Sequence, residues 1–279
     1  MSMNSATIVG PRLTGLRKFG LNPSVQLAIK QALVALGLIL LWQLALVFKL
    51  MPPAGMPYPL PTFHRLGALF LTGSYWTAIF NTMLGWVIGM TLSAMVAIPL
   101  GVIIGLNGFL VQSTRFTIDF MRTVPPVALL PVMLLLLGPS LSMKLALIIS
   151  GSVWPLLIQS IYAAGQLDNV QRDAARSFRF SRWVRIRHLI VPSVTPFIST
   201  GIRIAATISL LLSVTAEYIG GAPGIGFQLG QAEMNGVLTD MYAYILTAAA
   251  LGVALNIGFI KLQKIVLWWH PSVRAGGKS

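Results

Sequence analysis

The sequence predicts an all-α polytopic membrane protein with six transmembrane helices and both termini in the cytosol. The first observation behind this fold class is composition: 56% of the 279 residues are hydrophobic and only 9% are charged. Soluble globular chains carry about 25% charged residues, so this chain cannot cover a water-facing surface. The second observation is a series of six apolar runs, each close to or above the roughly 20 helical residues that a bilayer core requires. The third is the distribution of basic residues between those runs.

The apolar runs set the order of the elements. The predicted spans lie at about residues 26–48, 76–106, 114–137, 143–165, 195–217 and 241–268. The predicted organisation is a cytosolic tail (1–24), a first span with its outside loop (25–75), a transmembrane domain (76–268) and a second cytosolic tail (269–279). Prolines between Pro52 and Pro61 prevent a long helix at the start of the outside loop, and a short helix is predicted near residues 62–71. We expect no cleavable signal peptide, because residues 1–23 lack an apolar core.

Basic residues predict the orientation. With both termini inside, fifteen Lys or Arg residues lie in inside segments or at inside span ends, and three lie outside: Lys49, Arg65 and Lys144. Basic residues collect in cytosolic loops, so we reject the reversed topology. The same rule accounts for the net charge of +14 and leaves no argument for a nucleic-acid partner. The absence of cysteine excludes disulfides, thiolate metal sites and a catalytic thiol, and the three histidines are too far apart in the sequence to suggest a metal site.

The second span contains two pairs of glycines four residues apart: Gly85 with Gly89, and Gly101 with Gly105. Small residues at this spacing let another helix approach closely in lipid. The alternative is that glycine is simply common in membrane helices. We predict a close helix contact along this span.

One long polar stretch, residues 168–192, interrupts the apolar sequence. It holds His188 and six arginines: Arg172, Arg176, Arg179, Arg182, Arg185 and Arg187. Asp168 can cap a helix that starts at Asn169. Ser181 can cap a second short helix, which should end near Val191 because a proline follows it. The stretch is either a docking element for a partner or an amphipathic helix lying on anionic headgroups.

The first of these short helices has two distinct faces. A basic face carries Arg172, Arg176 and Arg179, spaced i, i+4, i+7. An apolar patch on another face is expected to contain Ala174, Ala175 and Phe178. A basic face beside an apolar patch suits binding in a groove on an acidic partner protein.

The segment DAARSFRFSRWVRIRHLIVP, residues 173–192, resembles the EAA loop of binding-protein-dependent ABC importer permeases. That pattern is Glu-Ala-Ala, three residues, Gly, nine residues and Ile-x-Leu-Pro. It maps here onto Asp173, Ala174, Ala175, Arg179, Leu189, Val191 and Pro192. MRTVPPVALLPVMLLLLG and GIRIAATISLLLSVTAEYIGGAPGIGFQL resemble segments of the subfamily that imports sulfonates, taurine, nitrate and thiamine precursors. The likeness covers about residues 76–268.

The resemblance implies a permease subunit in the bacterial cytoplasmic (inner) membrane, with no catalytic residue, cofactor or metal of its own. It implies two separate ABC ATPase subunits that bind ATP and Mg, a second permease subunit, and an extracytoplasmic substrate-binding protein. The implied solute is small and anionic. The implied ATPase-coupling residues, within a coupling loop at 166–194, are Asp173, Ala174, Ala175, Arg176, Phe178, Arg179 and Pro192.

Two residues depart from the family pattern. Asp173 replaces Glu, and Arg179 replaces the Gly that lets the chain turn between the two short helices at little steric cost. We therefore expect that the turn differs or that the first helix runs longer. A hypothesis follows that this chain pairs with a second, different permease subunit and not with a copy of itself.

The third span carries Pro125, Pro126 and Pro131, which remove helical hydrogen bonds. Broken backbone at membrane depth is tolerated where it is buried in protein or lines a cavity, so this span is the predicted translocation path. The alternative is a kinked but sealed packing helix. Arg122 within the span either attracts an anionic solute, pairs with Asp119 or reaches the cytosolic boundary, and we favour the structural pair.

Glu217 ends the fifth span. It is predicted to belong to an outer gate or to meet the binding protein, with a solvated loop residue as the alternative. The glycine-rich loop after it, within the predicted outside loop at about 218–240, suits close contact with another surface, for which the binding protein is the expected partner. The second functional hypothesis is an ion-gradient-driven secondary transporter, a class that tends to have two related halves. The third is a structural membrane scaffold.

Overall fold

The computed structural model describes residues 23–50, 52, 55–167 and 169–268. The helices up to the bend in the third predicted span are α1 (Pro23–Val47), α2 (Pro59–Leu69), α3 (Gly73–Gly105), α4 (Gly108–Met121), the 3₁₀ helix η1 (Pro126–Leu129) and α5 (Leu130–Leu137). The others are α6 (Leu141–Gly165), α7 (Asn169–Ser177), α8 (Arg182–Arg185), the π-helical η2 (Ile186–Ile190), α9 (Val191–Tyr218), α10 (Ile225–Met234) and α11 (Leu238–Val266).

The predicted all-α class is confirmed, whereas the predicted cytosolic location of the termini stays a prediction. Among the described residues, five helices are long and apolar enough to cross a membrane, and the number is six if the bent pair formed by Gly108–Met121 and Pro126–Leu137 counts as one span. The chain divides into two compact units, residues 1–59 and 60–279. In the first unit the indole Nε1 of Trp42 donates to the carbonyl of Pro57 at 3.0 Å, so the segment after α1 folds back on it. The predicted boundary at residue 76 stays a prediction.

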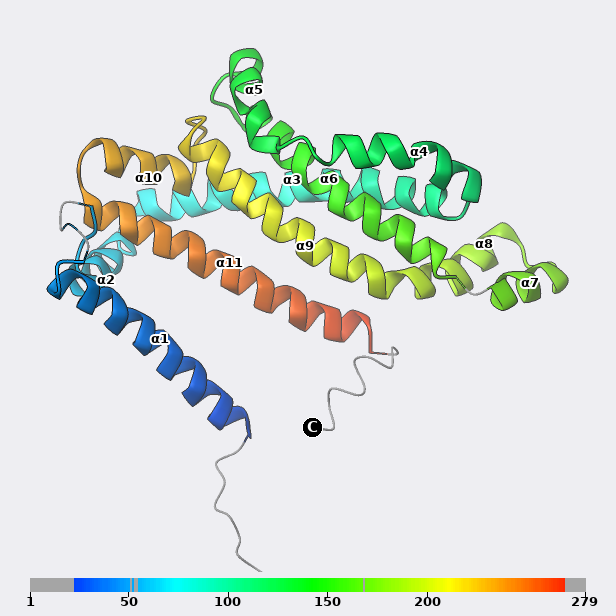
Figure 1. The fold of residues 1–279 in the computed structure, drawn as a ribbon, viewed down its shortest axis with the longest axis horizontal. Coiled ribbons are helices and arrows are strands. Elements are labelled where there is room, and N and C mark those ends of the chain that lie inside the picture. Colours follow the sequence, from blue (N-terminus) through cyan, green and yellow to red (C-terminus); the bar gives the residue numbers. More distant parts are fainter. Residues whose placement is uncertain (1–22, 51, 53–54, 168, 269–279) are drawn as a thin grey trace, which may run out of the picture. The chain divides into compact units, whose positions relative to one another are not determined.

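In the second unit α3, α6 and α9 pack side by side (Figure 1). A Cβ placed on any of the four paired glycines of α3 would lie 2.4 to 2.6 Å from an atom of α6. The predicted close helix contact is therefore confirmed, with α6 as the partner. The hydroxyls of Ser93 and Ser152 meet 2.7 Å apart in this contact. Helix α3 also contacts α9, where the indole of Trp86 donates to the backbone carbonyl of Ala206 at 2.8 Å.

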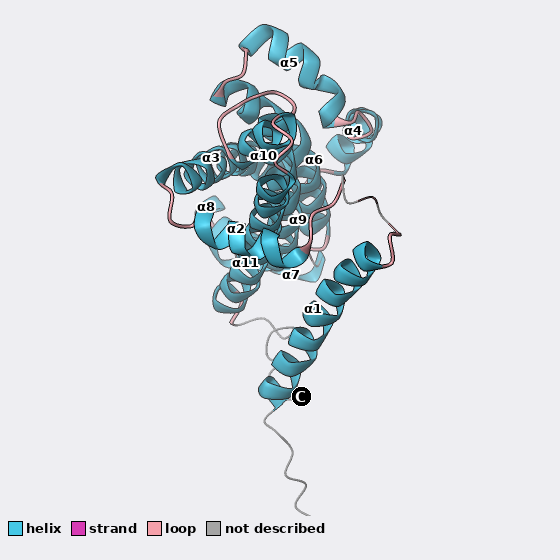
Figure 2. Cartoon of the chain, turned by 90° about the vertical axis from the view of Figure 1, so that its left-hand side faces the viewer, coloured by secondary structure: helices cyan, strands magenta, loops and turns pink. Residues whose placement is uncertain are grey.

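The third predicted span is broken. Helix α4 ends at Met121, and the next helical segment begins at Pro126 and runs at 69° to it. Proline is well placed at a helix start because its missing N–H has no partner there anyway. The prolines therefore end one helix and begin the next, as the sequence predicts. Figure 2 shows α4 and α5 at the edge of the helix cluster.

One predicted helix end is wrong. The helix that Ser181 caps does not stop before Pro192, because the chain continues as η2 and then α9 up to Tyr218. The N–H of Val191 donates to the carbonyl of Ile186, five residues back, so the turn before the proline is widened. A widened turn accommodates a residue that lacks an N–H, since the ordinary hydrogen-bond ladder is already interrupted there.

Candidate functional site

Residues 169–192, which we call the coupling segment after their predicted role, consist of α7, a tight turn, and then α8, η2 and the first two residues of α9. Helix α7 ends at Ser177, and Arg179 takes a φ of +52°, a left-handed conformation that glycine adopts without steric cost. The N–H of Phe180 donates to the carbonyl of Ala175 at 3.1 Å, which is the 6→1 bond of a Schellman helix end. Arginine thus occupies the conformation expected of the family glycine, and α7 does not run longer.

The turn is followed by a capped helix start. The hydroxyl of Ser181 accepts from the N–H of Val184 at 3.4 Å, as predicted. Asp168 and the side chains of Arg172 and Arg176 lie outside the described residues, so the predicted cap at Asn169 and the basic face stay predictions.

The exposed apolar groups of the coupling segment differ from the predicted patch. Ala175 is buried, whereas Ala174 and Phe178 are exposed. Phe178 is 74% exposed and stacks on Phe180 with ring centroids 6.1 Å apart, and Trp183 is 79% exposed. We call Phe178, Phe180 and Trp183 the aromatic patch. Sequence reasoning missed two of its members, although aromatic residues in a polar stretch were a visible signal.

The base of the coupling segment is held by a small apolar core. Ala163, Ala164 and Leu167 at the end of α6 pack with Val194 at the start of α9, together with the partly buried Leu189 and Ile190. This core therefore joins the end of α6 to the start of α9 at the base of the segment.

A second group of predicted residues lies in a buried polar network around Glu217. Its carboxylate is fully buried, so the alternative of a solvated loop residue is wrong. Oε1 accepts from Lys144 Nζ at 2.7 Å and from Ser213 Oγ at 3.2 Å. Oε2 accepts from Thr82 Oγ1 at 2.8 Å and from the N–H of Gly226 at 3.0 Å. The network therefore joins α3, α6, α9 and α10.

Lys144 has a full set of acceptors in this network. Besides Glu217, its ammonium donates to the carbonyls of Asn81 at 3.2 Å and Pro223 at 2.8 Å. Sequence reasoning treated Lys144 only as an outside basic residue, and the structure places its side chain in the interior, 2% exposed. A buried charge is tolerated only when it is paired and hydrogen-bonded, and both conditions are met here.

The glycine-rich loop folds onto this carboxylate. A Cβ at Gly224 would lie 2.1 Å from the Cδ of Glu217, and one at Gly226 would lie 2.3 Å from the carbonyl oxygen of Val214. The predicted close contact is present, but the surface it meets belongs to this chain. Contact with a binding protein stays a prediction.

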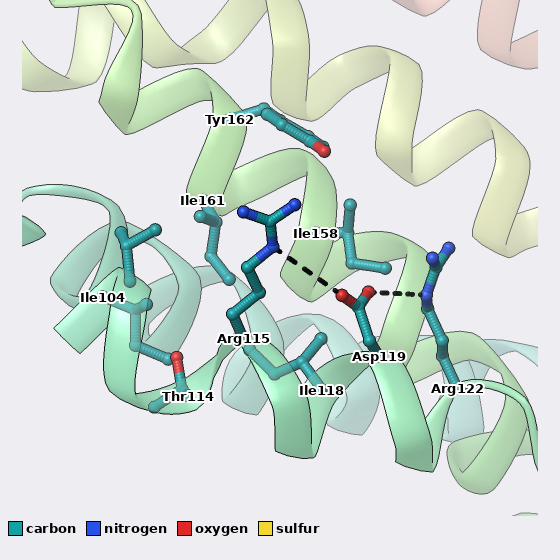
Figure 3. A pocket seen from close by; sticks show the side chains of 10 residues that line it. Ile104, Thr114, Arg115, Ile118, Asp119, Arg122, Ile158, Ile161 and Tyr162 are labelled. Carbon is teal, nitrogen blue, oxygen red and sulfur yellow. Dashed lines mark ion pairs between the residues drawn. The ribbon is translucent and has the colours of Figure 1, made fainter.

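The third group surrounds the broken span. Arg122 Nε lies 3.1 Å from Asp119 Oδ1, which is the predicted pair, and Arg115 Nε lies 3.9 Å from Oδ2 of the same carboxylate. These three side chains line a cavity of about 380 Å³ between α3, α4 and α6, which also contains Thr114 and Tyr162 (Figure 3). We call it the arginine cavity. Sequence reasoning singled out Arg122 but not Arg115, although the two share a helix stripe with Asp119.

The turn that carries Pro125 and Pro126 rests against α6. A Cβ at Gly151 would lie 3.0 Å from Pro126 and 2.3 Å from Leu212, so Gly151 makes room for the turn. Pro131 lies in the first turn of α5. The structure therefore places the predicted residues in three separate locations: the coupling segment, the buried polar network and the broken span with its arginine cavity.

Comparison with known proteins identifies the family to which the chain belongs. The sequence model described as binding-protein-dependent transport system inner membrane component matches residues 97–267. The chain is 30% identical over 246 residues to the bicarbonate transport system permease protein CmpB of Synechocystis sp., with 83% of this chain and 86% of that protein covered. It is 26% identical over 243 residues to the taurine transport system permease protein TauC of Escherichia coli, covering 85% and 88%.

Two further comparisons agree. The nitrate import permease protein NrtB of Synechocystis sp. is 27% identical over 189 residues, covering 68% of this chain and 69% of that protein. An inward-facing structure of the MetNI methionine ABC transporter aligns with a TM-score of 0.61 at 15% identity, covering 68% of this chain and 96% of the other. This structural likeness confirms the permease fold. The chain belongs to the binding-protein-dependent transport system inner membrane components, as an ABC transporter permease similar to those for nitrate, taurine and bicarbonate.

Proposed function

We propose that this permease forms the translocation path for a small anionic solute and is driven by two separate ABC ATPase subunits that dock on residues 168–192. The observation that carries the proposal is the coupling segment, with its aromatic patch exposed above an apolar core that joins α6 to α9. Exposed apolar groups rimmed by charge mark interaction sites. Arginines flank the patch on both sides in the sequence, which favours a protein groove with acidic walls.

The proposed mechanism is rigid-body transmission. ATP and Mg bind to the partner ATPase subunits, whose closure moves α7 and α8. The apolar core passes that movement to the membrane helices, and such switching commonly proceeds by rotation of packed units about an interface. Asp173, Ala174 and Arg176 on α7, the turn at Arg179, and Pro192 at the start of α9 are the proposed coupling residues, together with the buried Ala175 and the exposed Phe178.

The proposed solute class rests on the relatives and on the broken span. The relatives are named for bicarbonate, nitrate and taurine, each of which carries a small anionic group. The span with Pro125, Pro126 and Pro131 is the proposed path, because irregular backbone at membrane depth is expected next to a cavity. Arg122 supplies positive charge along that path. Glu217 holds the outer end of α9 against α3, α6 and α10, which supports the proposed outer gate.

The remaining proposed partners follow from the family. They are an extracytoplasmic substrate-binding protein, the lipid bilayer of the bacterial inner membrane, and a second permease subunit that is identical or related. The conformation of Arg179 weakens the argument for an obligatory different subunit, since the turn forms without glycine. Isolation of the complex with one permease species at two copies would contradict the heterodimer hypothesis.

The test uses the absence of cysteine from the chain, so that any introduced cysteine is unique. Phe178→Cys in the aromatic patch is expected to crosslink to an ATPase subunit. Phe109→Cys is the matched control, since both phenylalanines are 74% exposed. Leu71, in the predicted outside loop, is 89% exposed, so Leu71→Cys is the positive control for labelling from outside in whole cells. ATP-dependent uptake by vesicles that hold the complete transporter is the functional readout. Labelling of Phe178→Cys from outside the cell, or equal crosslinking of both phenylalanine variants, would contradict the proposal.

A further inference from the structure

The arginine cavity carries net positive charge at the inner end of a predicted membrane span, about residues 114–137. Arg115 and Arg122 contribute two positive charges and Asp119 one negative charge, and their side chains are 81%, 51% and 50% exposed. A charge in a membrane span is costly in contact with lipid and almost always faces a cavity or a protein interior. The stripe of α4 that carries these residues therefore faces water or protein.

The ion pairs leave most of each guanidinium available. Asp119 is approached by the Nε atom of both arginines, and in Figure 3 the terminal nitrogens of Arg115 and Arg122 point away from its carboxylate. Within the described part of the chain, no residue accepts a hydrogen bond from those terminal nitrogens. A guanidinium is a planar fork of donors, and its free edge matches two oxygens of a planar or tetrahedral oxyanion.

The cavity also has suitable size and lining. Its volume of about 380 Å³ exceeds what a small oxyanion with a few waters requires. Isoleucines form its apolar wall, and Tyr162, drawn above Arg115 in Figure 3, also lines it. Arg115 lies in α4 and Arg122 is the residue that caps its C-terminal end, seven positions later and still in a helical conformation, so the two share a face and can reach a single ligand.

We propose that the arginine cavity is a binding site for a small oxyanion of the nitrate, bicarbonate or sulfonate type, with Arg115 and Arg122 as its ligands. Asp119 acts as an internal counterion. It pairs with the arginines when no solute is bound, and it competes with a bound solute for the same arginines. Competition keeps binding weak, and weak binding allows a transported ion to leave. This inference rests on the proposed function, since it names a station for the solute beside the proposed path.

The test places one cysteine in this cavity and one in a neighbouring cavity. Thr114→Cys lies in the arginine cavity. Ser150→Cys is the matched control, because it lines a cavity of about 370 Å³ that contains no charged residue. Both native side chains are hydroxyls that donate to a backbone carbonyl of their own helix, at 2.7 and 2.8 Å. The complete transporter is labelled in nanodiscs of zwitterionic lipid with a sulfonate-bearing and a trimethylammonium-bearing methanethiosulfonate of similar size.

At Thr114→Cys the anionic reagent should react faster than the cationic reagent by about tenfold, the effect of a focused positive potential. At Ser150→Cys the two reagents should react at similar rates. Sodium nitrate, bicarbonate or taurine should slow labelling of Thr114→Cys at constant ionic strength, whereas sodium gluconate, which is bulkier, should slow it less. Equal rates for the two reagents at Thr114→Cys, failure of both reagents to react there, or absence of protection by all three solutes would overturn the site.

Charge variants separate the roles of the three residues. Arg115→Gln and Arg122→Gln should each abolish the preference for the anionic reagent or reduce it severalfold. Asp119→Asn should lower the half-protecting solute concentration by about three- to tenfold, the change expected on removal of two partly exposed ion pairs. If Asp119→Asn weakens protection instead, the counterion role is wrong.

Two further arms separate the alternatives. Added phosphatidylglycerol tests whether the anion is a lipid headgroup: protection by this lipid alone, and by none of the three solutes, would overturn the inference. ATP-dependent uptake is measured on the same preparations. ATP-dependent uptake without solute protection of Thr114→Cys would overturn the site but not the proposed function. Solute protection of Thr114→Cys without ATP-dependent uptake would overturn the proposed function but not the site.

Discussion

Lys144 of α6 and Glu217 of α9 form an ion pair of 2.7 Å in which the two side chains are 2% and 0% exposed. Neither charge reaches water, and every polar atom of the pair has a protein partner. The pair also connects α3 and α10, through Thr82 and the N–H of Gly226. Four helices, three of which are distant in the sequence, are therefore held together by one carboxylate.

Removal of one partner should be strongly destabilising. Lys144→Met leaves Glu217 buried without a counter-charge, which typically costs about 3–5 kcal/mol. Thermal or SDS-induced unfolding of the purified chain in detergent measures the loss. The double variant Lys144→Met with Glu217→Gln removes both charges and should lose less stability than Lys144→Met alone. A double variant that is as unstable as the sum of the two single variants would argue against direct coupling.

Thr82→Val should destabilise the same network without changing its charge. The hydroxyl both donates to Glu217 and accepts from the N–H of Ile225 at 2.9 Å, and valine is of similar shape. Two buried polar groups lose a partner, at about 1–3 kcal/mol each. The unfolding midpoint should fall, whereas Thr77→Val, at an exposed position on the same helix, should leave it nearly unchanged.

The glycine contact between α3 and α6 predicts a steric effect. A Cβ at Gly105 would lie 2.4 Å from the carbonyl oxygen of Ile161, so Gly105→Ala forces backbone apart and should cost about 1–3 kcal/mol. A Cβ at Gly108 would have no atom within 4 Å, so Gly108→Ala should be neutral or slightly stabilising. Unfolding midpoints of the two variants provide the comparison. Equal midpoints would show that the helices separate easily.

The turn at Arg179 predicts a stabilising substitution. Its φ of +52° is unfavourable for a side chain with a Cβ, by about 1–2 kcal/mol, so Arg179→Gly should relieve strain and Arg179→Val should increase it. Gly236 is the reference position, with a φ of +69° in the same kind of helix end, where Gly236→Ala should be destabilising. Stability and stimulated ATPase activity of the complete transporter are measured together. Unchanged stability with lost activity would assign the arginine side chain to partner contact.

An exposed ion pair should contribute much less to stability than the buried pair. Arg65 in α2 binds Asp240 through two bonds, of 2.6 and 2.8 Å, but the arginine is 46% exposed. The hydrogen bonds and charge of Asp240 raise the pKa of Arg65 above its ordinary value. Partly exposed pairs contribute about 0–1 kcal/mol, so Arg65→Gln should cost far less than Lys144→Met in the same unfolding assay. A comparable loss would contradict the small contribution expected of this exposed pair.

Several features were predictable because they depend on local chemistry. Apolar runs of sufficient length are predicted as spans wherever they occur, and the prolines at 125, 126 and 131 interrupt the third span because they lack an N–H. Helix periodicity alone brings Asp119 next to Arg122. The Ser181 cap needs only a hydroxyl and a backbone N–H three residues later.

Other features depend on which helices meet. The sequence by itself determined the membrane class, the order of the spans, the broken third span and the family motif. Only the tertiary structure decided that Glu217 is buried against Lys144, that the glycine-rich loop folds onto it, that the helix continues through Pro192, and that Arg115 shares a cavity with Arg122. The physical reason is that hydropathy and backbone preferences act over a few residues, whereas burial and charge pairing depend on contacts between helices up to a hundred residues and more apart in the chain.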